Sequence, residues 1–182
     1  PTYSPPVASR AFGYLGATAY EAVALGRDDL RTLAGQVNGL EPLAIDATGT
    51  DPALVLHAAL APAVAEFFGN TGPTGQRAMA AMTARLDTQL EAGLSPEVIA
   101  ASRAAGAAVA ARIGAWAATD GGAVIENMGF PFDWTLRDAP GAWVPTSRIV
   151  QQQAPLLPFW GGNRPFVMPD GAACALPPPP AY

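Results

Sequence analysis

Residues 95–122 read SPEVIAASRAAGAAVAARIGAWAATDGG and contain the clearest helix in the chain. Ser95 before Pro96 is a helix start, because the serine hydroxyl can accept a bond from a free backbone N–H and proline tolerates the first helical position. Gly121 and Gly122 end the helix. Apolar or small residues follow one face at helical spacing: they are Ile99, Ser102, Gly106, Val109, Ile113 and Trp116.

A strip of small residues runs along the same helix. Gly106, Ala110 and Gly114 recur every four residues, which lets another helix approach closely; in a membrane the same spacing favours dimerisation. Arg103 and Arg112 flank the strip. We therefore expect close packing inside a soluble helical bundle.

Further helices are predicted on both sides of a proline-containing loop. Ser4 and Asp51 are candidate N-caps, each followed by proline. The pattern predicts helices over residues 4–26 and 29–38, with Gly39 as a left-handed stop, then one from Asp51 to a turn at 69–75, and one after that turn, closed by Gly93. Pro62 lacks an N–H, so a kink or break is expected near Leu60.

The composition changes near residue 130. Residues 131–182 hold eleven of the nineteen prolines, and eight of the fifteen aromatic residues lie from Phe130 onward. So many prolines favour neither helices nor central strands, and the rings need a surface to cover. The predicted fold is all-α: a bundle of about five helices in residues 1–130, and an extended wrapping segment, 131–182, that lies across it.

Charge and composition exclude several function classes. The ten basic residues are all arginine, and fifteen acidic residues give a net charge of −5, which leaves no electrostatic basis for nucleic-acid binding. The charge-poor stretch 52–65 is shorter than the roughly 20 residues of a membrane span, so we expect no span. One cysteine, Cys174, and one histidine, His57, exclude an internal disulfide and a multi-histidine metal site.

Few side chains are candidates for chemistry. His57 lies among apolar helical residues, where a core histidine with one satisfied nitrogen is the usual finding. Asp87 and Glu91, four residues apart on one helix, are interpreted as a solvated pair. No catalytic, cofactor-binding or metal-ligating residue is therefore assigned to this chain.

Two stretches carry a family resemblance. Residues 141–146 read GAWVPT, and residues 155–166 read PLLPFWGGNRPF. In this order they resemble the segment that precedes the catalytic half in bacterial vanadium-dependent haloperoxidase homologues, a helical superfamily that includes the type 2 phosphatidic acid phosphatases. Residues 5–11 and 19–23 look like that family's first helix, so the resemblance spans nearly the whole chain.

The resemblance implies a partner and a cofactor, and it implies that residues 131–182 link the helices to a missing catalytic half. Its catalytic half, on the same polypeptide or on a cleaved chain, would hold vanadate, or phosphate as substrate, with one lysine, two arginines and two histidines. This chain has no lysine and one histidine and cannot build that site alone. Arg164-Pro165 matches the end of one family motif, but the lysine position is Leu157, so Arg164 is interpreted as a packing or ion-pair residue.

The same resemblance suggests which residues face the absent half. Trp143, Phe159, Trp160 and Phe166 would form a pocket wall, with Asp120 or Arg164 supplying a charge behind it; simple core packing stays an alternative. A periplasmic or secreted location is also implied.

Two functions remain open. In the first, the chain is the N-terminal scaffold portion of a bacterial haloperoxidase-like or acid-phosphatase-like enzyme, an oxidoreductase or a hydrolase. In the second, it is a non-catalytic helical interaction module whose proline-rich tail, ending in Pro179-Pro180-Ala181-Tyr182, binds a partner in polyproline II form. A homodimer is compatible with either.

Overall fold

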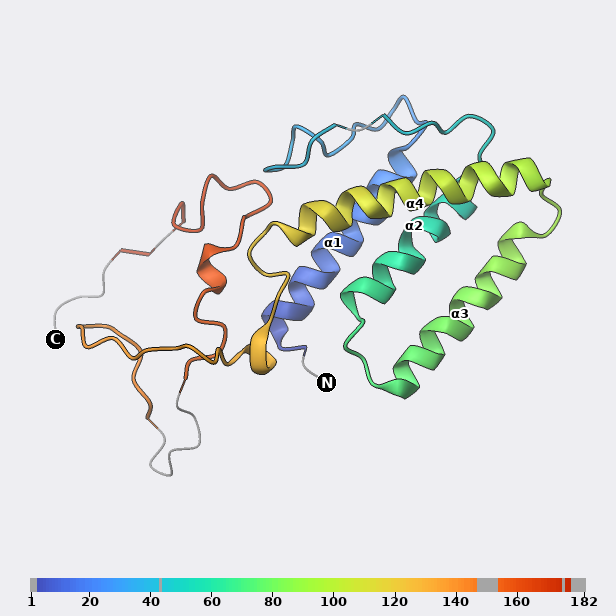
Figure 1. Ribbon diagram of the computed structural model, residues 1–182. Helices are drawn as coiled ribbons and strands as arrows, with labels where there is room; N and C mark the ends of the chain where they lie inside the picture. The colour runs from blue at the N-terminus through green and yellow to red at the C-terminus, as the bar shows by residue number, and fades with distance from the viewer. Residues whose placement is uncertain (1–2, 43, 147–153, 175, 178–182) are drawn as a thin grey trace. The chain divides into compact units, whose positions relative to one another are not determined.

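The computed structural model describes residues 3–42, 44–146, 154–174 and 176–177 (Figure 1). The chain divides into two compact units, Pro1–Ala118 and Thr119–Tyr182. The first contains α1 (Pro5–Ala24), α2 (Pro52–Phe67), α3 (Pro73–Glu91) and α4 (Pro96–Ala118). No strand occurs in the described ranges, so the prediction of an all-α fold is confirmed.

Each α-helix of the first unit begins at a proline. The Asp51 carboxylate accepts a hydrogen bond from Leu54 N at 2.9 Å, whereas Ser4 caps α1 without a side-chain bond. Gly26 and Gly93 follow the ends of α1 and α3 with φ of +75° and +83°, a backbone conformation that favours glycine. The start and stop residues seen in the sequence therefore set these helix boundaries.

α2 is the central helix and packs on α1, α3 and α4. It meets α4 most closely at Gly106, where a Cβ would lie 2.6 Å from both Ala58 Cβ and the Val55 carbonyl oxygen. A Cβ on Gly114 would lie 2.9 Å from a Glu66 carboxylate oxygen. At Gly106 backbone atoms obstruct a Cβ, so glycine is required and the predicted close packing is confirmed there; at Gly114 the near atoms belong to the flexible Glu66 side chain, which can move.

Aromatic side chains join three helices in the core. The fully buried Tyr14 of α1 stacks on Phe67 of α2 at 5.6 Å between ring centroids. On its other side it meets Trp116 of α4 edge-on at 4.9 Å. The indole N–H of Trp116 donates to the Asn38 carbonyl at 2.8 Å, so the same cluster holds the long loop between α1 and α2.

A buried ion pair links α4 to α1. Arg112 pairs with Glu21, and the two side chains are 10% and 5% exposed. The Glu21 carboxylate also accepts hydrogen bonds from the Thr32 hydroxyl and the Leu33 N–H. Burial lowers the pKa of the Arg112 guanidinium. Three separate parts of the first unit therefore meet at Glu21.

Three local predictions need correction. Residues 29–38 contain turns and bends but no helix, because the Leu33 N–H bonds to Glu21 and Gly35 adopts a φ of +76°; Gly39 does adopt the predicted left-handed φ, at +74°. Of the kink or break expected near Leu60, the break is wrong: α2 continues through Pro62, whose exposed ring leaves the buried face of the helix packed, while a kink there stays a prediction. The turn expected at 69–75 ends earlier, since α3 starts at Pro73.

Within the described residues, α4 is the one helix long and apolar enough to cross a membrane by length and composition. Its buried side includes Ser102, Val109 and Ile113, and Arg112 is paired with Glu21. This is also the pattern of a central helix in a bundle.

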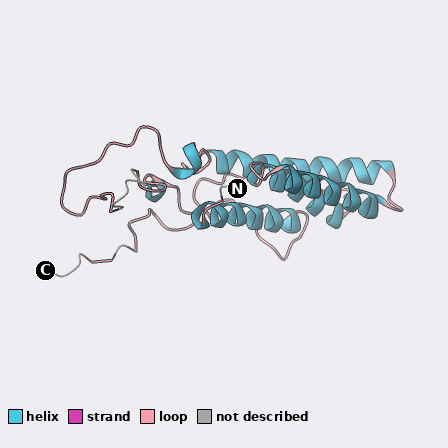
Figure 2. Ribbon diagram, turned by 90° about the horizontal axis from the view of Figure 1, so that it is seen from below, coloured by secondary structure: helices cyan, strands magenta, loops and turns pink. Residues whose placement is uncertain are grey.

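The second unit is mostly irregular (Figure 2). Its regular structure is limited to two short 3-10 helices, η1 (Glu126–Gly129) and η2 (Trp160–Gly162), in the parts of 119–182 that are described. Residues 131–146 and 154–174 therefore follow the irregular, non-α course expected from their prolines. That this segment lies across the helices stays a prediction.

Candidate functional site

The second unit begins with a turn that joins two distant stretches of sequence. The Asp120 carboxylate accepts from Gly122 N at 2.7 Å, while the Asp120 carbonyl accepts from Arg164 N at 2.8 Å. The Arg164 guanidinium donates to the Thr119 hydroxyl at 2.9 Å. Asp120 is 5% exposed. Asp120 and Arg164 thus connect residues 119–122 to residues 162–164, and we call this contact the first crossing.

The same two parts of the second unit meet again at a second crossing, between residues 128–129 and residues 156–157. Leu157 N donates to the Gly129 carbonyl at 2.7 Å, and a Cβ on Gly129 would lie 2.7 Å from Leu156 Cδ1. Met128 and Leu157 have φ of +60° and +51°, the left-handed region that costs a residue with a Cβ on the order of 1 kcal/mol. The contact between the two stretches therefore fixes a backbone that neither residue prefers.

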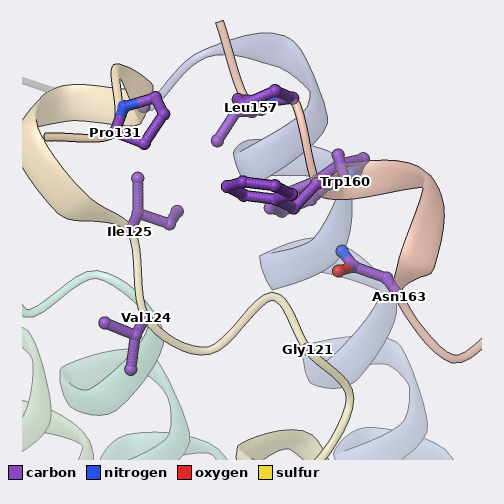
Figure 3. A pocket seen from close by; sticks show the side chains of 10 residues that line it. Gly121, Val124, Ile125, Pro131, Leu157, Trp160 and Asn163 are labelled. Carbon is purple, nitrogen blue, oxygen red and sulfur yellow. The ribbon is translucent and has the colours of Figure 1, made fainter. Parts of the chain in front are cut away.

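Between these crossings lies an apolar cavity of about 230 Å³ (Figure 3). Apolar side chains make most of its wall, and the Asn163 amide is the polar side chain among the lining residues, none of which is ionisable. The lining residues are Gly121, Val124, Ile125, Gly129, Pro131, Leu157, Pro158, Phe159, Trp160 and Asn163. The cavity therefore suits a small apolar or aromatic group and offers no cation to an oxyanion.

The structure brings together part of the predicted pocket wall. Phe159 and Trp160 line the cavity, whereas Trp143 and Phe166 are not among its lining residues. Asp120 and Arg164 stand beside the cavity and form the first crossing, so Arg164 serves as a packing and hydrogen-bonding residue. Whether this wall faces a catalytic half stays a prediction.

Sequence reasoning missed the opposite wall, which comes from Gly121 to Pro131. The glycines at 121 and 129 were the available signal, since they have φ of +93° and +100°. A second hollow of about 380 Å³ shares Pro158 and Phe159 with the first cavity. It is bordered by Trp134, whose ring lies 5.7 Å from that of Phe159, and by Arg137.

The histidine of the chain lies in the first unit and is tied into an ion-pair cluster. His57 of α2 is buried, and its Nε2 lies 3.0 Å from Asp87 Oδ1 of α3. The same oxygen accepts from Arg103 of α4 at 3.0 Å, and Arg103 Nε donates to Glu91 at 2.6 Å. Hydrogen bonding to Glu91 and the nearby carboxylate charges raise the pKa of Arg103. This confirms His57 as a core histidine with a satisfied nitrogen.

The prediction that Asp87 and Glu91 form a solvated pair was wrong. Their side chains are 28% and 29% exposed and both contact Arg103, because α4 brings this arginine against the carboxylates of α3. The cluster places two carboxylates against one guanidinium. The Arg103 guanidinium therefore already has two carboxylate partners.

The residues of this chain do not fit a vanadate site. An oxyanion of this type needs several cationic donors around it and an imidazole in line. The described part of the chain has its one imidazole bonded to Asp87, and the sequence has no lysine. Nor do the described residues contain a group of three or more histidine, cysteine, aspartate or glutamate side chains that could hold a metal ion.

The sequence and structure of the chain were compared with those of known proteins. No model of a known protein family matches the chain, and no curated protein matches it. Among solved structures, the chain is similar to one described as the first bacterial vanadium-dependent iodoperoxidase, with 33% sequence identity and a TM-score of 0.76. The match covers 99% of this chain and 41% of the iodoperoxidase.

The fold is thus a helical scaffold of the kind found in vanadium-dependent peroxidases. In sequence and fold the chain is similar to a vanadium-dependent haloperoxidase, the resemblance that its sequence motifs predicted. It spans less than half the length of the member that it matches.

Proposed function

We propose that this chain is the N-terminal scaffold portion of a vanadium-dependent haloperoxidase, and that polypeptide following Tyr182 supplies the vanadate site. One observation carries the proposal: the structural match covers 99% of this chain but only 41% of the iodoperoxidase. The role of this chain is then to position and brace that polypeptide.

The distribution of charge in the chain supports a scaffold role. Arg112, which is 10% exposed, is paired with Glu21, and Arg103 is shared by two carboxylates. Each of these cations holds helices together, and neither is arranged with the other around a common anion. The full enzyme would therefore draw its cationic donors and in-line imidazole from elsewhere.

Turnover by two proteins tests the proposal. The 182-residue chain and the longer natural polypeptide are each assayed for peroxide-driven iodide oxidation, with and without added vanadate. We expect vanadate-dependent oxidation by the longer protein and none by the 182-residue chain. Hydrolysis of p-nitrophenyl phosphate by the longer protein without any iodide oxidation would instead assign it to the phosphatases.

Two results would contradict the scaffold role. One is iodide oxidation by the 182-residue chain itself. The other is a longer protein that lacks both activities and binds a proline-motif reader through its tail, which would favour the interaction module.

A further inference from the structure

Both charged side chains of α1, Arg10 and Glu21, interact inside the first unit. Arg10 donates to the Ala117 carbonyl at 2.7 Å and lies 4.9 Å from the centre of the Tyr14 ring. Glu21 is 6% exposed and pairs with Arg112. In a surface helix the charged residues ordinarily lie on the solvent side. In α1 they lie on the inner side.

The outer side of α1 carries an apolar stripe. Phe12 is 63% exposed, Val23 40% and Tyr20 36%. Together with Gly16 they form one line along the helix, which we call the outer stripe. The Tyr20 hydroxyl donates to the Arg31 carbonyl at 2.9 Å, so its polar end is already satisfied, and its ring is partly exposed.

Packing inside the first unit does not require a glycine at position 16. A Cβ at this position would meet no atom within 4 Å, and a glycine in a helix interior is less stable than alanine. Gly106, by contrast, is required by the approach of α2. An unneeded glycine between two exposed rings leaves a notch that an approaching helix could use.

We propose that the outer stripe of α1 is the docking surface for a helix of the polypeptide that supplies the vanadate site, with a large apolar side chain of that helix seated over Gly16. This inference rests on the proposed function. The occupant must be uncharged where it meets the stripe, because no charged side chain of α1 faces it. The similar iodoperoxidase is more than twice as long as its matched region, which gives an enzyme of this kind ample chain to cover the stripe.

The small size of the stripe favours an occupant on the same polypeptide over a second copy. A stable interface between separate proteins uses roughly 20–30 residues a side. The outer stripe consists of four residues on one helix. A covalently connected helix avoids most of the cost of association, since its effective concentration is high.

Thiol accessibility in the longer protein tests this proposal. Cys174→Ser removes the one cysteine of residues 1–182, and any cysteine beyond residue 182 is likewise changed to serine. Gly16→Cys is compared with Ala84→Cys, which places a thiol at an exposed position of α3. We expect the thiol at position 16 to react about tenfold or more slowly than the thiol at position 84, with equal rates in urea. Equal rates in the native protein would overturn the proposal.

A photo-crosslink identifies the occupant. Phe12 is replaced by p-benzoylphenylalanine in the longer protein, the crosslinked peptide is sequenced by mass spectrometry, and the same group at Ala84 is the control. We expect a crosslink to a peptide beyond residue 182. A crosslink to residues 119–182, or one between two copies that disappears on dilution, would overturn it. Iodide oxidation by the Cys174→Ser protein is measured separately: its absence with the crosslink present would refute the activity but leave the docking surface in place.

Discussion

The two units of this chain obtain their order in different ways. In the first unit, regular helices meet through small residues and buried rings, as where Gly106 admits α2 and where Tyr14 lies between Phe67 and Trp116. In the second unit, two irregular stretches are fastened by a few backbone bonds and hold Met128 and Leu157 at positive φ. The helical unit is therefore held by a packed core. In the second unit, the cavity wall includes Leu157, whose backbone lies in an unfavourable conformation.

The largest expected effect comes from the buried ion pair of the helical unit. Arg112→Met should lower the free energy of unfolding by roughly 3 kcal/mol at neutral pH, because it leaves the Glu21 carboxylate buried without its cation. Urea denaturation followed by circular dichroism measures this. The matched control, Arg112→Met with Glu21→Gln, should recover most of the loss, and an equally unstable double variant would contradict a charge-based explanation.

Close helix packing predicts the next effect. Gly106→Ala should lower the free energy of unfolding by about 1–3 kcal/mol, since the new Cβ would collide with the Val55 carbonyl and Ala58. Gly16→Ala in the same 182-residue chain is the control and should raise it by about 0.5–1 kcal/mol. If both substitutions stabilise the chain, α2 and α4 are less tightly packed than described.

A smaller effect of opposite sign is expected in the second unit. Met128→Gly should relieve the backbone at φ +60° and stabilise residues 119–146 by up to about 1 kcal/mol, because the Met128 side chain is 62% exposed and little packing is lost. Hydrogen exchange of the Leu157 amide, which bonds to Gly129, reports it. Faster exchange in the variant would show that the Met128 side chain matters more than its backbone.

The smallest effect concerns acid. Hydrogen bonding to Ser95 lowers the pKa of Glu97, and bonding to the Thr48 backbone lowers the pKa of Asp46. A folded-state pKa below the unfolded value means that the contribution is present at neutral pH and is lost as pH falls below about 4. Glu97→Gln should therefore slightly flatten the decline of melting temperature with acidification. An unchanged or steeper decline would contradict this assignment.

Much of the helical unit follows from its sequence. Pro5, Pro52 and Pro96 were recognised as first helical residues, and the structure begins α1, α2 and α4 there. The false helix at 29–38 had the right local pattern. It failed because Glu21, buried by Arg112 from a distant helix, takes the Leu33 N–H, and no local pattern contains that contact.

The cavity was predictable on one side only. Phe159 and Trp160 are large rings in a proline-rich stretch, so a wall function could be read from their residue types. The facing residues Val124 and Ile125 carry no such signal. They reach the cavity because the chain turns at Gly121 and Gly129 and is fastened at Leu157, which is a tertiary arrangement.

The central claim is that this chain braces a vanadate site that it does not contain. Titration of the purified 182-residue chain with vanadate, followed by ⁵¹V NMR, tests that claim most directly. We predict no saturable binding at neutral pH, because the one imidazole is engaged by Asp87, and Arg112 and Arg103 are paired with carboxylates. Stoichiometric binding that competes with phosphate and is lost in His57→Ala would contradict the account.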